Sequence, residues 1–167
     1  MFKRVENNIN LAQVENEISN YWDEIDAFQT SLNNRKNDKI FRFYDGPPFP
    51  TGSPHYGNLL AGVIKDIVPR YWTMRGYYVE RRFGWDVHGL PIEMEVQKNL
   101  NLEDPQQIDE YGIGKFNEAC RTQVQTNTEN WEKITRKIGR WVDFENDYKT
   151  MDIDFMESVW WVFKELW

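Results

Sequence analysis

The segment from Phe43 to Asn58, FYDGPPFPTGSPHYGN, combines residue types that could bind a phosphate group. An extended run leads into a loop of prolines and glycines, and His55 stands where a long helical pattern begins. Prolines stiffen a loop and remove competing N–H donors, while Gly46 and Gly52 allow backbone geometry or a close approach that a Cβ would block. We therefore expect the N–H groups of the helix start and the imidazole of His55 to bind an anion.

This loop departs from the two common phosphate-binding motifs. Five residues separate Gly46 from Gly52, and Ser53 and Pro54 stand where a Walker A loop requires lysine and then serine or threonine. No G-x-G-x-x-G run occurs in the chain. Taken alone, a run of prolines and glycines is more often just a turn, and a histidine at a helix start is more often a cap than a phosphate ligand.

A second dense segment, GWDVHGLPIE, runs from Gly84 to Glu93. Taken alone, Asp86 is expected to cap a helix or to carry a solvated loop charge, and Trp85 to pack in the core. Glu93 and Glu95 are expected on a solvated helix face. Near the end of the chain, Trp160, Trp161 and Phe163 are expected to pack.

The composition restricts the class of protein. A chain of 167 residues can bury a core, and its eight Trp and ten Phe exclude a disordered chain. A net charge of -7 argues against nonspecific nucleic-acid binding through a basic surface. One cysteine, Cys120, and two histidines allow neither a disulfide framework nor a Cys/His zinc cluster. Because no secretory leader and no apolar stretch of spanning length is visible, we expect a soluble cytoplasmic protein.

Two strands and several helices are expected to position these segments. The apolar spacing predicts helices at residues 10–33, 56–75 with a kink at Pro69, 90–99, 114–139 and 152–167, strands at 40–44 and 77–82, and a turn at 102–106. A strand, a helix and a strand over residues 40–82 form the βαβ unit of a parallel sheet. Since such a sheet normally needs more strands, and the last helix ends at Trp167 without a cap or a turn, we expect the chain to be a fragment or the sheet to be completed elsewhere.

Read in order, several segments closely resemble the N-terminal part of isoleucyl-tRNA synthetase. They are YDGPPFPTGSPHYGN, KDIVPRYWTMRGYYVERRFGWDVHGLPIE, NEACRTQV and ESVWWVFKELW. The resemblance covers residues 41–167, and GWDVHGLPIE is similar to the version in the isoleucine enzyme. It implies an α/β fold: a partial Rossmann-like, class I parallel sheet with flanking helices and an N-terminal helix. Residues 1–37 would be an N-terminal helical extension, and residues 38–167 the first half of the catalytic domain, truncated before the editing insertion.

The resemblance also implies a reaction and its participants. The isoleucine carboxylate would attack the α-phosphate of ATP, with Mg²⁺ sharing the charge, and the isoleucyl group would then pass to the 3′ end of the tRNA for isoleucine. The full-length protein is expected to be a monomer and to have no contact with a membrane. No covalent enzyme intermediate and no protein metal ligand are expected.

Residue roles carry over from the same motifs. His55, Tyr56, Gly57 and Asn58 occupy the HIGH signature, and Pro48 and Gly52 join them at the ATP site. His55 and Asn58 would be the catalytic pair, although Asn58 stands where the signature usually has a second histidine and cannot carry a charge. The resemblance implies that isoleucine is bound by five residues: Gly46, Pro47, Trp85, Asp86 and His88. Asp86 would pair with the substrate ammonium.

Two alternatives stay open beside the ligase. One is an inactive relative that acts only as a binding or interaction module, and the other is an HxGH-type nucleotidyltransferase for another acid, which GWDVHGLPIE disfavours. No KMSKS-like loop, editing domain or anticodon-reading domain occurs in the chain. We therefore expect the 167 residues alone not to make isoleucyl-adenylate at a useful rate. A pocket alone is expected to discriminate weakly against valine, because valine differs from isoleucine by one methylene and isoleucyl-tRNA synthetase is itself the standard example of this weak discrimination.

Overall fold

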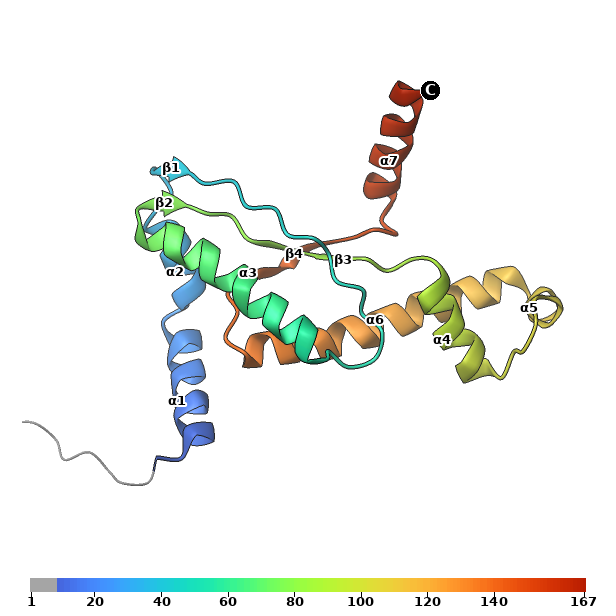
Figure 1. The fold of residues 1–167 in the computed structure, drawn as a ribbon, viewed down its shortest axis with the longest axis horizontal. Coiled ribbons are helices and arrows are strands. Elements are labelled where there is room, and N and C mark those ends of the chain that lie inside the picture. The colour runs from blue at the N-terminus through green and yellow to red at the C-terminus, as the bar shows by residue number, and fades with distance from the viewer. Residues whose placement is uncertain (1–8) are drawn as a thin grey trace, which may run out of the picture.

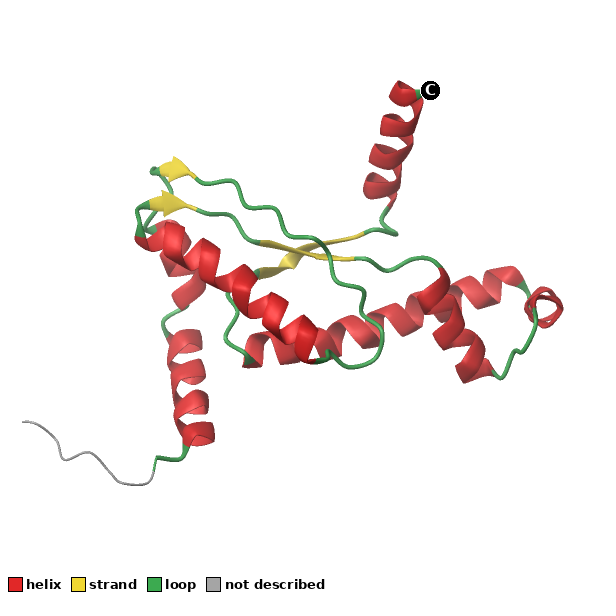
Figure 2. Ribbon diagram, in the orientation of Figure 1, coloured by secondary structure: helices red, strands yellow, loops and turns green. Residues whose placement is uncertain are grey.

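A computed structural model describes residues 9–167, so the first eight residues of the predicted N-terminal extension lie outside the described part. In chain order the elements are α1 Leu11–Glu24, α2 Ala27–Asn33, β1 Lys39–Ile40, α3 Tyr56–Met74, β2 Tyr77–Tyr78, β3 Arg82–Trp85, α4 Leu90–Leu100, α5 Pro105–Tyr111, α6 Ile113–Lys137, β4 Asp143–Lys149 and α7 Ile153–Leu166. The fold is mixed α/β (Figures 1 and 2).

The strands form two short parallel pairs, β1 with β2 and β3 with β4. The predicted strand at 77–82 is therefore two strands, separated by residues 79–81. The strand predicted at 40–44 was wrong beyond Ile40, where β1 ends. One further hydrogen bond joins the two chain segments, from the Phe41 N–H to the Tyr78 carbonyl, and pairing stops there. The chain then leaves the sheet, and Asp45 pairs with Arg140 in the segment that follows α6.

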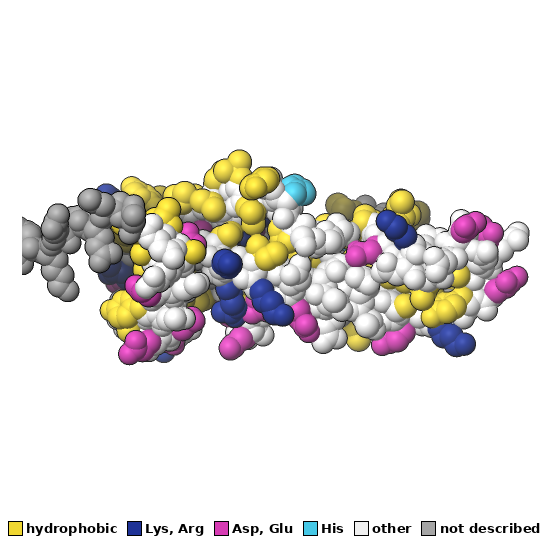
Figure 3. Space-filling view, turned by 90° about the horizontal axis from the view of Figure 1, so that it is seen from below, with side chains coloured by type: hydrophobic (Ala, Val, Ile, Leu, Met, Phe, Trp, Pro, Cys, Tyr) yellow, Lys and Arg dark blue, Asp and Glu magenta, His cyan; other side chains and the backbone are white. Residues whose placement is uncertain are grey.

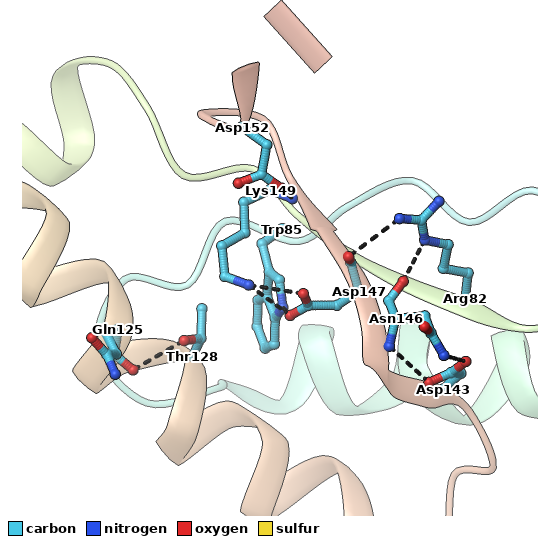
Figure 4. Close-up of polar contacts among 9 residues, drawn as sticks. All are labelled: Arg82, Trp85, Gln125, Thr128, Asp143, Asn146, Asp147, Lys149 and Asp152. Atoms are coloured by element: carbon cyan, nitrogen blue, oxygen red, sulfur yellow. Dashed lines mark hydrogen bonds and ion pairs between the residues drawn. The ribbon is translucent and has the colours of Figure 1, made fainter. Parts of the chain in front are cut away.

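Strand β4 was not predicted, because DFENDYK is too polar for a strand pattern. Hydrogen bonds from side chains of β3 stabilise this polar strand (Figure 4). The Arg82 guanidinium donates to the backbone carbonyls of Asn146 and Asp147, and Trp85 Nε1 donates to Asp147 Oδ2 at 2.6 Å. Lys149 Nζ lies 2.8 Å from the same carboxylate, so the polar residues of β4 are paired where they are half-buried.

The main core lies where β3, β4, α4 and α6 meet. Its fully buried members include Phe83, Trp85 and Val124, and Phe83 stacks on Phe144 with ring centroids 4.7 Å apart. Phe49 packs against this core. It belongs to the proline-rich loop, residues 45–54, which precedes α3. The loop is thus packed against the main core.

Helix boundaries follow the predictions with two corrections. The single predicted helix at 10–33 is broken at Asp26, which has a left-handed backbone with φ 44°, so α1 and α2 are separate. The predicted turn at 102–106 ends in a short helix, because Asp104 caps α5 by accepting from the Gln107 N–H. Gly76, with φ 90°, follows the end of α3 as expected for a glycine past a C-cap.

The expectation of packing for Trp160, Trp161 and Phe163 was wrong, since all three are exposed on α7. In Figure 1 this helix stands away from the rest of the fold, and its aromatic link to the sheet is the stack of Phe155 on Tyr148. A second apolar stripe on α3, which includes Leu60, is also exposed. Figure 3 shows apolar side chains gathered along one edge of the molecule. No helix in the described part of the chain is long and apolar enough to cross a membrane.

Candidate functional site

The proline-rich loop is held at its two ends by side chains of α3, of α6 and of the segment that follows α6. At the first end, the buried Asp45 carboxylate pairs with Arg140 and with Lys65, whose Nζ lies 2.5 Å from Oδ1. Lys65 Nζ also donates to the Gly46 carbonyl at 2.9 Å. At the second end, Trp131 Nε1 donates to the Gly52 carbonyl at 2.8 Å. These long-range contacts fix the loop, although its own residues form no regular structure.

His55 is the N-cap of α3, as its position predicts. Its Nδ1 accepts from the Gly57 N–H at 3.1 Å, and its own N–H donates to Asn58 Oδ1 at 3.0 Å. Because Nδ1 is an acceptor, the proton of the neutral ring is on Nε2, and the exposed ring offers a donor. A Cβ at Gly57 would lie 3.0 Å from His55 Cε1, so glycine leaves the ring room over the helix start.

The two motifs meet through one backbone hydrogen bond. The Asp86 N–H donates to the Pro48 carbonyl at 2.9 Å. Asp86 does not cap α4, whose N-cap is Gly89, so the first expectation for this residue was wrong. Its half-buried carboxylate faces Thr150 Oγ1 at 3.4 Å instead. The bond therefore places a carboxylate beside the loop whose far end carries His55.

The remaining predicted residues differ in their exposure and in which of their polar groups are already hydrogen-bonded. Trp85 is buried in the core with 1% of its surface exposed, and its indole N–H is used by Asp147. His88 is exposed, with Nδ1 2.7 Å from Thr150 Oγ1. The Pro47 carbonyl accepts no hydrogen bond from residues 9–167, whereas that of Pro48 is occupied. Tyr56, at the first position of α3, is almost fully exposed.

A small cavity of about 90 Å³ lies between the loop, α3 and α6. Its lining includes Pro48, Asn58 and Lys65. A larger hollow of about 600 Å³ lies beside residues 40–45 and the start of α7, and none of the predicted site residues lines it. The predicted residues thus form an open surface with one small cavity rather than a closed pocket.

Sequence reasoning missed three side chains that hold the site. They are Lys65 and Arg140, which bind Asp45, and Thr150, which touches residues 86–88. No local spacing relates these residues to the motifs, because their partners are distant in the chain. Glu95 is a further correction: it is half-buried and accepts from Gln123 and Asn127 rather than lying on a solvated face.

The residues described by the structure form no cage of protein ligands for a metal ion. No group of three or more His, Cys, Asp or Glu side chains within residues 9–167 is arranged to hold one. Mg²⁺ is usually held by one or two carboxylates together with substrate phosphates, so it would enter with ATP rather than in a cage of protein ligands.

Comparison with known proteins shows the family of the chain. The family model described as tRNA synthetases class I (I, L, M and V) matches residues 17–167. The chain belongs to this family. Isoleucine--tRNA ligase, cytoplasmic, of Arabidopsis thaliana is 56% identical over 153 residues, which are 92% of this chain and 13% of that protein. Isoleucine--tRNA ligase of Treponema denticola is 50% identical over all 167 residues and is matched over 15% of its length.

The class I synthetase fold is also seen in a solved structure. The crystal structure of the ternary complex of Agrobacterium radiobacter K84 agnB2 LeuRS, tRNA and LeuAMS matches 91% of this chain and 17% of that chain, with a TM-score of 0.65 and 19% identity. At that identity the likeness shows the fold alone. The chain spans 13% and 15% of the length of these two curated relatives.

Proposed function

We propose that this chain is the part of an isoleucine–tRNA ligase that binds isoleucine and the phosphates of ATP. Within a longer protein it would take part in forming isoleucyl-adenylate and then in transferring isoleucine to its tRNA. The names of the relatives that are 50% and 56% identical support the amino acid and the tRNA. Residues 1–37 would be an N-terminal extension, and the name of the Arabidopsis relative supports a cytoplasmic location.

The single observation that carries the proposal is the hydrogen bond from the Asp86 N–H to the Pro48 carbonyl. It joins the segment that carries the Asp86 carboxylate to the loop that leads into the N-terminus of α3. A carboxylate attracts an ammonium group, and a helix N-terminus with a histidine donor attracts phosphate oxygens. An amino acid and ATP present these two opposite charges when the amino acid is activated.

The roles proposed for the isoleucine-binding residues rest on which polar groups make no hydrogen bond within residues 9–167. Asp86 would pair with the ammonium group, and the unoccupied Pro47 carbonyl would accept a second hydrogen bond from it. His88 would lie beside them, with Gly46 in the pocket wall. Trp85 would act from the core, at the end of the strand that leads into Asp86.

The roles at the ATP end follow from α3. His55 would donate from Nε2 to phosphate oxygens as charge develops, and the first backbone N–H groups would add to this field. The amide of Asn58 would supply a neutral donor, while Pro48, Gly52, Tyr56 and Gly57 would line the approach of the nucleotide. Mg²⁺ would reach the site bound to ATP, and a monomeric full-length protein is part of the same proposal.

The test is isoleucine-dependent exchange of labelled pyrophosphate into ATP by a ligase-length chain that carries this segment. Asp86→Ala should raise the Michaelis constant for isoleucine far more than that for ATP. His55→Ala should slow activation and leave isoleucine affinity near normal. An unchanged constant for isoleucine in Asp86→Ala, or equal losses for both substrates in His55→Ala, would contradict the assigned roles.

A further inference from the structure

Thr150 contacts three consecutive residues, 86–88, in the segment proposed to bind isoleucine. It directly follows β4, only 5% of its surface is exposed, and its side chain points at the segment that leaves β3. Its Oγ1 lies 2.9 Å from the Val87 N–H that donates to it, 2.7 Å from His88 Nδ1 and 3.4 Å from Asp86 Oδ1. One hydroxyl therefore contacts Asp86, to which the proposed function assigns the ammonium group, and His88 beside it.

One arrangement of the hydrogens makes all three contacts of this hydroxyl favourable at once. A hydroxyl has one hydrogen and two acceptor lone pairs. The Val87 N–H takes one lone pair. The hydrogen is directed to Asp86, because an ionised carboxylate can only accept. In this arrangement the remaining lone pair accepts from His88, with the ring proton on Nδ1.

We propose that Thr150 is a positioning residue that holds His88 in the Nδ1–H tautomer and orients the Asp86 carboxylate. The other ring nitrogen, Nε2, accepts or donates no hydrogen bond with residues 9–167, and in this tautomer it is an acceptor. Asp86 and His88 then present two acceptors on one short segment. This inference rests on the proposed function for its substrate, an amino-acid ammonium group, but the tautomer itself does not.

The other histidine of the chain is held in the opposite way. His55 Nδ1 accepts from the Gly57 N–H, so its Nε2 carries the proton. One ring therefore offers a donor at the end assigned to phosphate, and the other offers an acceptor at the end assigned to the ammonium group. The two rings give internal references for each other in one spectrum, because the chain has only these two histidines.

The hydroxyl can be removed without removing the backbone contact of Thr150. Its N–H donates to the Trp85 carbonyl at 3.0 Å, and this bond is independent of the side chain. Thr150→Val keeps the shape and loses the hydroxyl, while Thr150→Ser keeps the hydroxyl. The pair separates a role of the oxygen atom from a role in packing.

The experiment is long-range ¹H–¹⁵N NMR of the two histidine rings in the 167-residue chain, at a pH where the spectrum shows both rings neutral. We expect His88 as the Nδ1–H tautomer in the unchanged chain and in Thr150→Ser, and a shift toward the mixture of a free ring in Thr150→Val. His55 should stay Nε2–H in all three. An Nε2–H tautomer of His88 in the unchanged chain overturns the proposal without any variant, as does a Thr150→Val spectrum with intact His55 signals and unchanged His88.

A second arm measures isoleucine affinity on the same three samples. Thr150→Val should weaken isoleucine binding by about tenfold, the effect of one lost hydrogen bond to a charged group, and Thr150→Ser should restore it. Equal affinity in all three overturns the positioning role. If no sample binds isoleucine while the tautomers are as stated, the proposed function fails and the assignment of Thr150 to the His88 tautomer is supported.

Discussion

The backbone N–H of His55 donates to Asn58 Oδ1 at 3.0 Å, and this bond closes the first turn of α3. Together with the bond from the Gly57 N–H to His55 Nδ1, it forms a capping box in which residues 55 and 58 each satisfy a backbone donor. Asn58 thus has a structural role at the place where the HIGH signature usually has its second histidine.

Removing the Asn58 acceptor should destabilise the start of α3. Asn58→Ala leaves the His55 N–H without its partner, and we expect a loss of about 1 kcal/mol in the free energy of unfolding. Asn58→Asp keeps an acceptor and places a negative charge at a helix N-terminus, so it should preserve stability. Urea denaturation followed by circular dichroism measures both, and equal stability of Asn58→Ala and the unchanged chain would contradict the capping role.

Substitutions at the same position separate capping from nucleotide binding. Asn58→Asp should weaken binding of ATP, because its carboxylate repels phosphate and lacks the amide donor. Asn58→Gln retains an amide and serves as the control for the charge. Tighter ATP binding by Asn58→Asp than by Asn58→Gln would argue against phosphate at this end of α3.

Asp45 should be the most sensitive charge of the loop. Its carboxylate and the Arg140 guanidinium each have only 6% of the side chain exposed, whereas Lys65 is 30% exposed. Asp45→Asn leaves Arg140 buried without its charged partner and should cost about 3 kcal/mol. Lys65→Met, which removes the more exposed partner, should cost less than about 1 kcal/mol. Chemical denaturation of both variants tests the order, and a larger loss in Lys65→Met would contradict it.

Gly84 should tolerate no side chain while Tyr148 lies across it. A Cβ at position 84 would overlap the Tyr148 ring, which is the register partner of Gly84 in the β3–β4 pair. Gly84→Ala should therefore cost roughly 2 kcal/mol. In the double variant with Tyr148→Ala the cost of the glycine change should largely disappear, since the two residues are in direct contact. Additive losses in that double-mutant cycle would show that the strain arises elsewhere.

Cys120 offers a check of the α4–α6 region because it is the only thiol. Burial raises the pKa of the Cys120 thiol above its ordinary value, and the negative charge of Glu93 raises it further. Glu93→Gln should lower that pKa, and the larger thiolate fraction should speed alkylation at about pH 8 by about twofold. The two chains should react at equal rates in urea. Equal rates in the folded chains as well would mean that Glu93 does not act on the thiol.

Local patterns in the sequence predicted the elements that local interactions decide, and they missed what depends on distant partners. The predicted helix at 56–75 is α3 within one residue, because its apolar period and its histidine cap are local features. Strand β4 was missed since its polar residues are stabilised by Arg82 and Trp85, about sixty residues earlier in the chain. The phosphate-facing loop was singled out by residue type, and the segment around Asp86 was assigned a role through the family resemblance. Their junction at Pro48 and Asp86 is a tertiary contact that no spacing encodes.

We propose above that Pro47 and Asp86 bind the ammonium group of isoleucine, and an NMR titration that follows residues 46–48 and 86–88 of the 167-residue chain tests this most directly. We predict saturable amide shifts in both segments at millimolar isoleucine, and their loss in Asp86→Asn, whose backbone bond to Pro48 is retained. The absence of saturable shifts in these two segments, or the same shifts in Asp86→Asn, would contradict this claim.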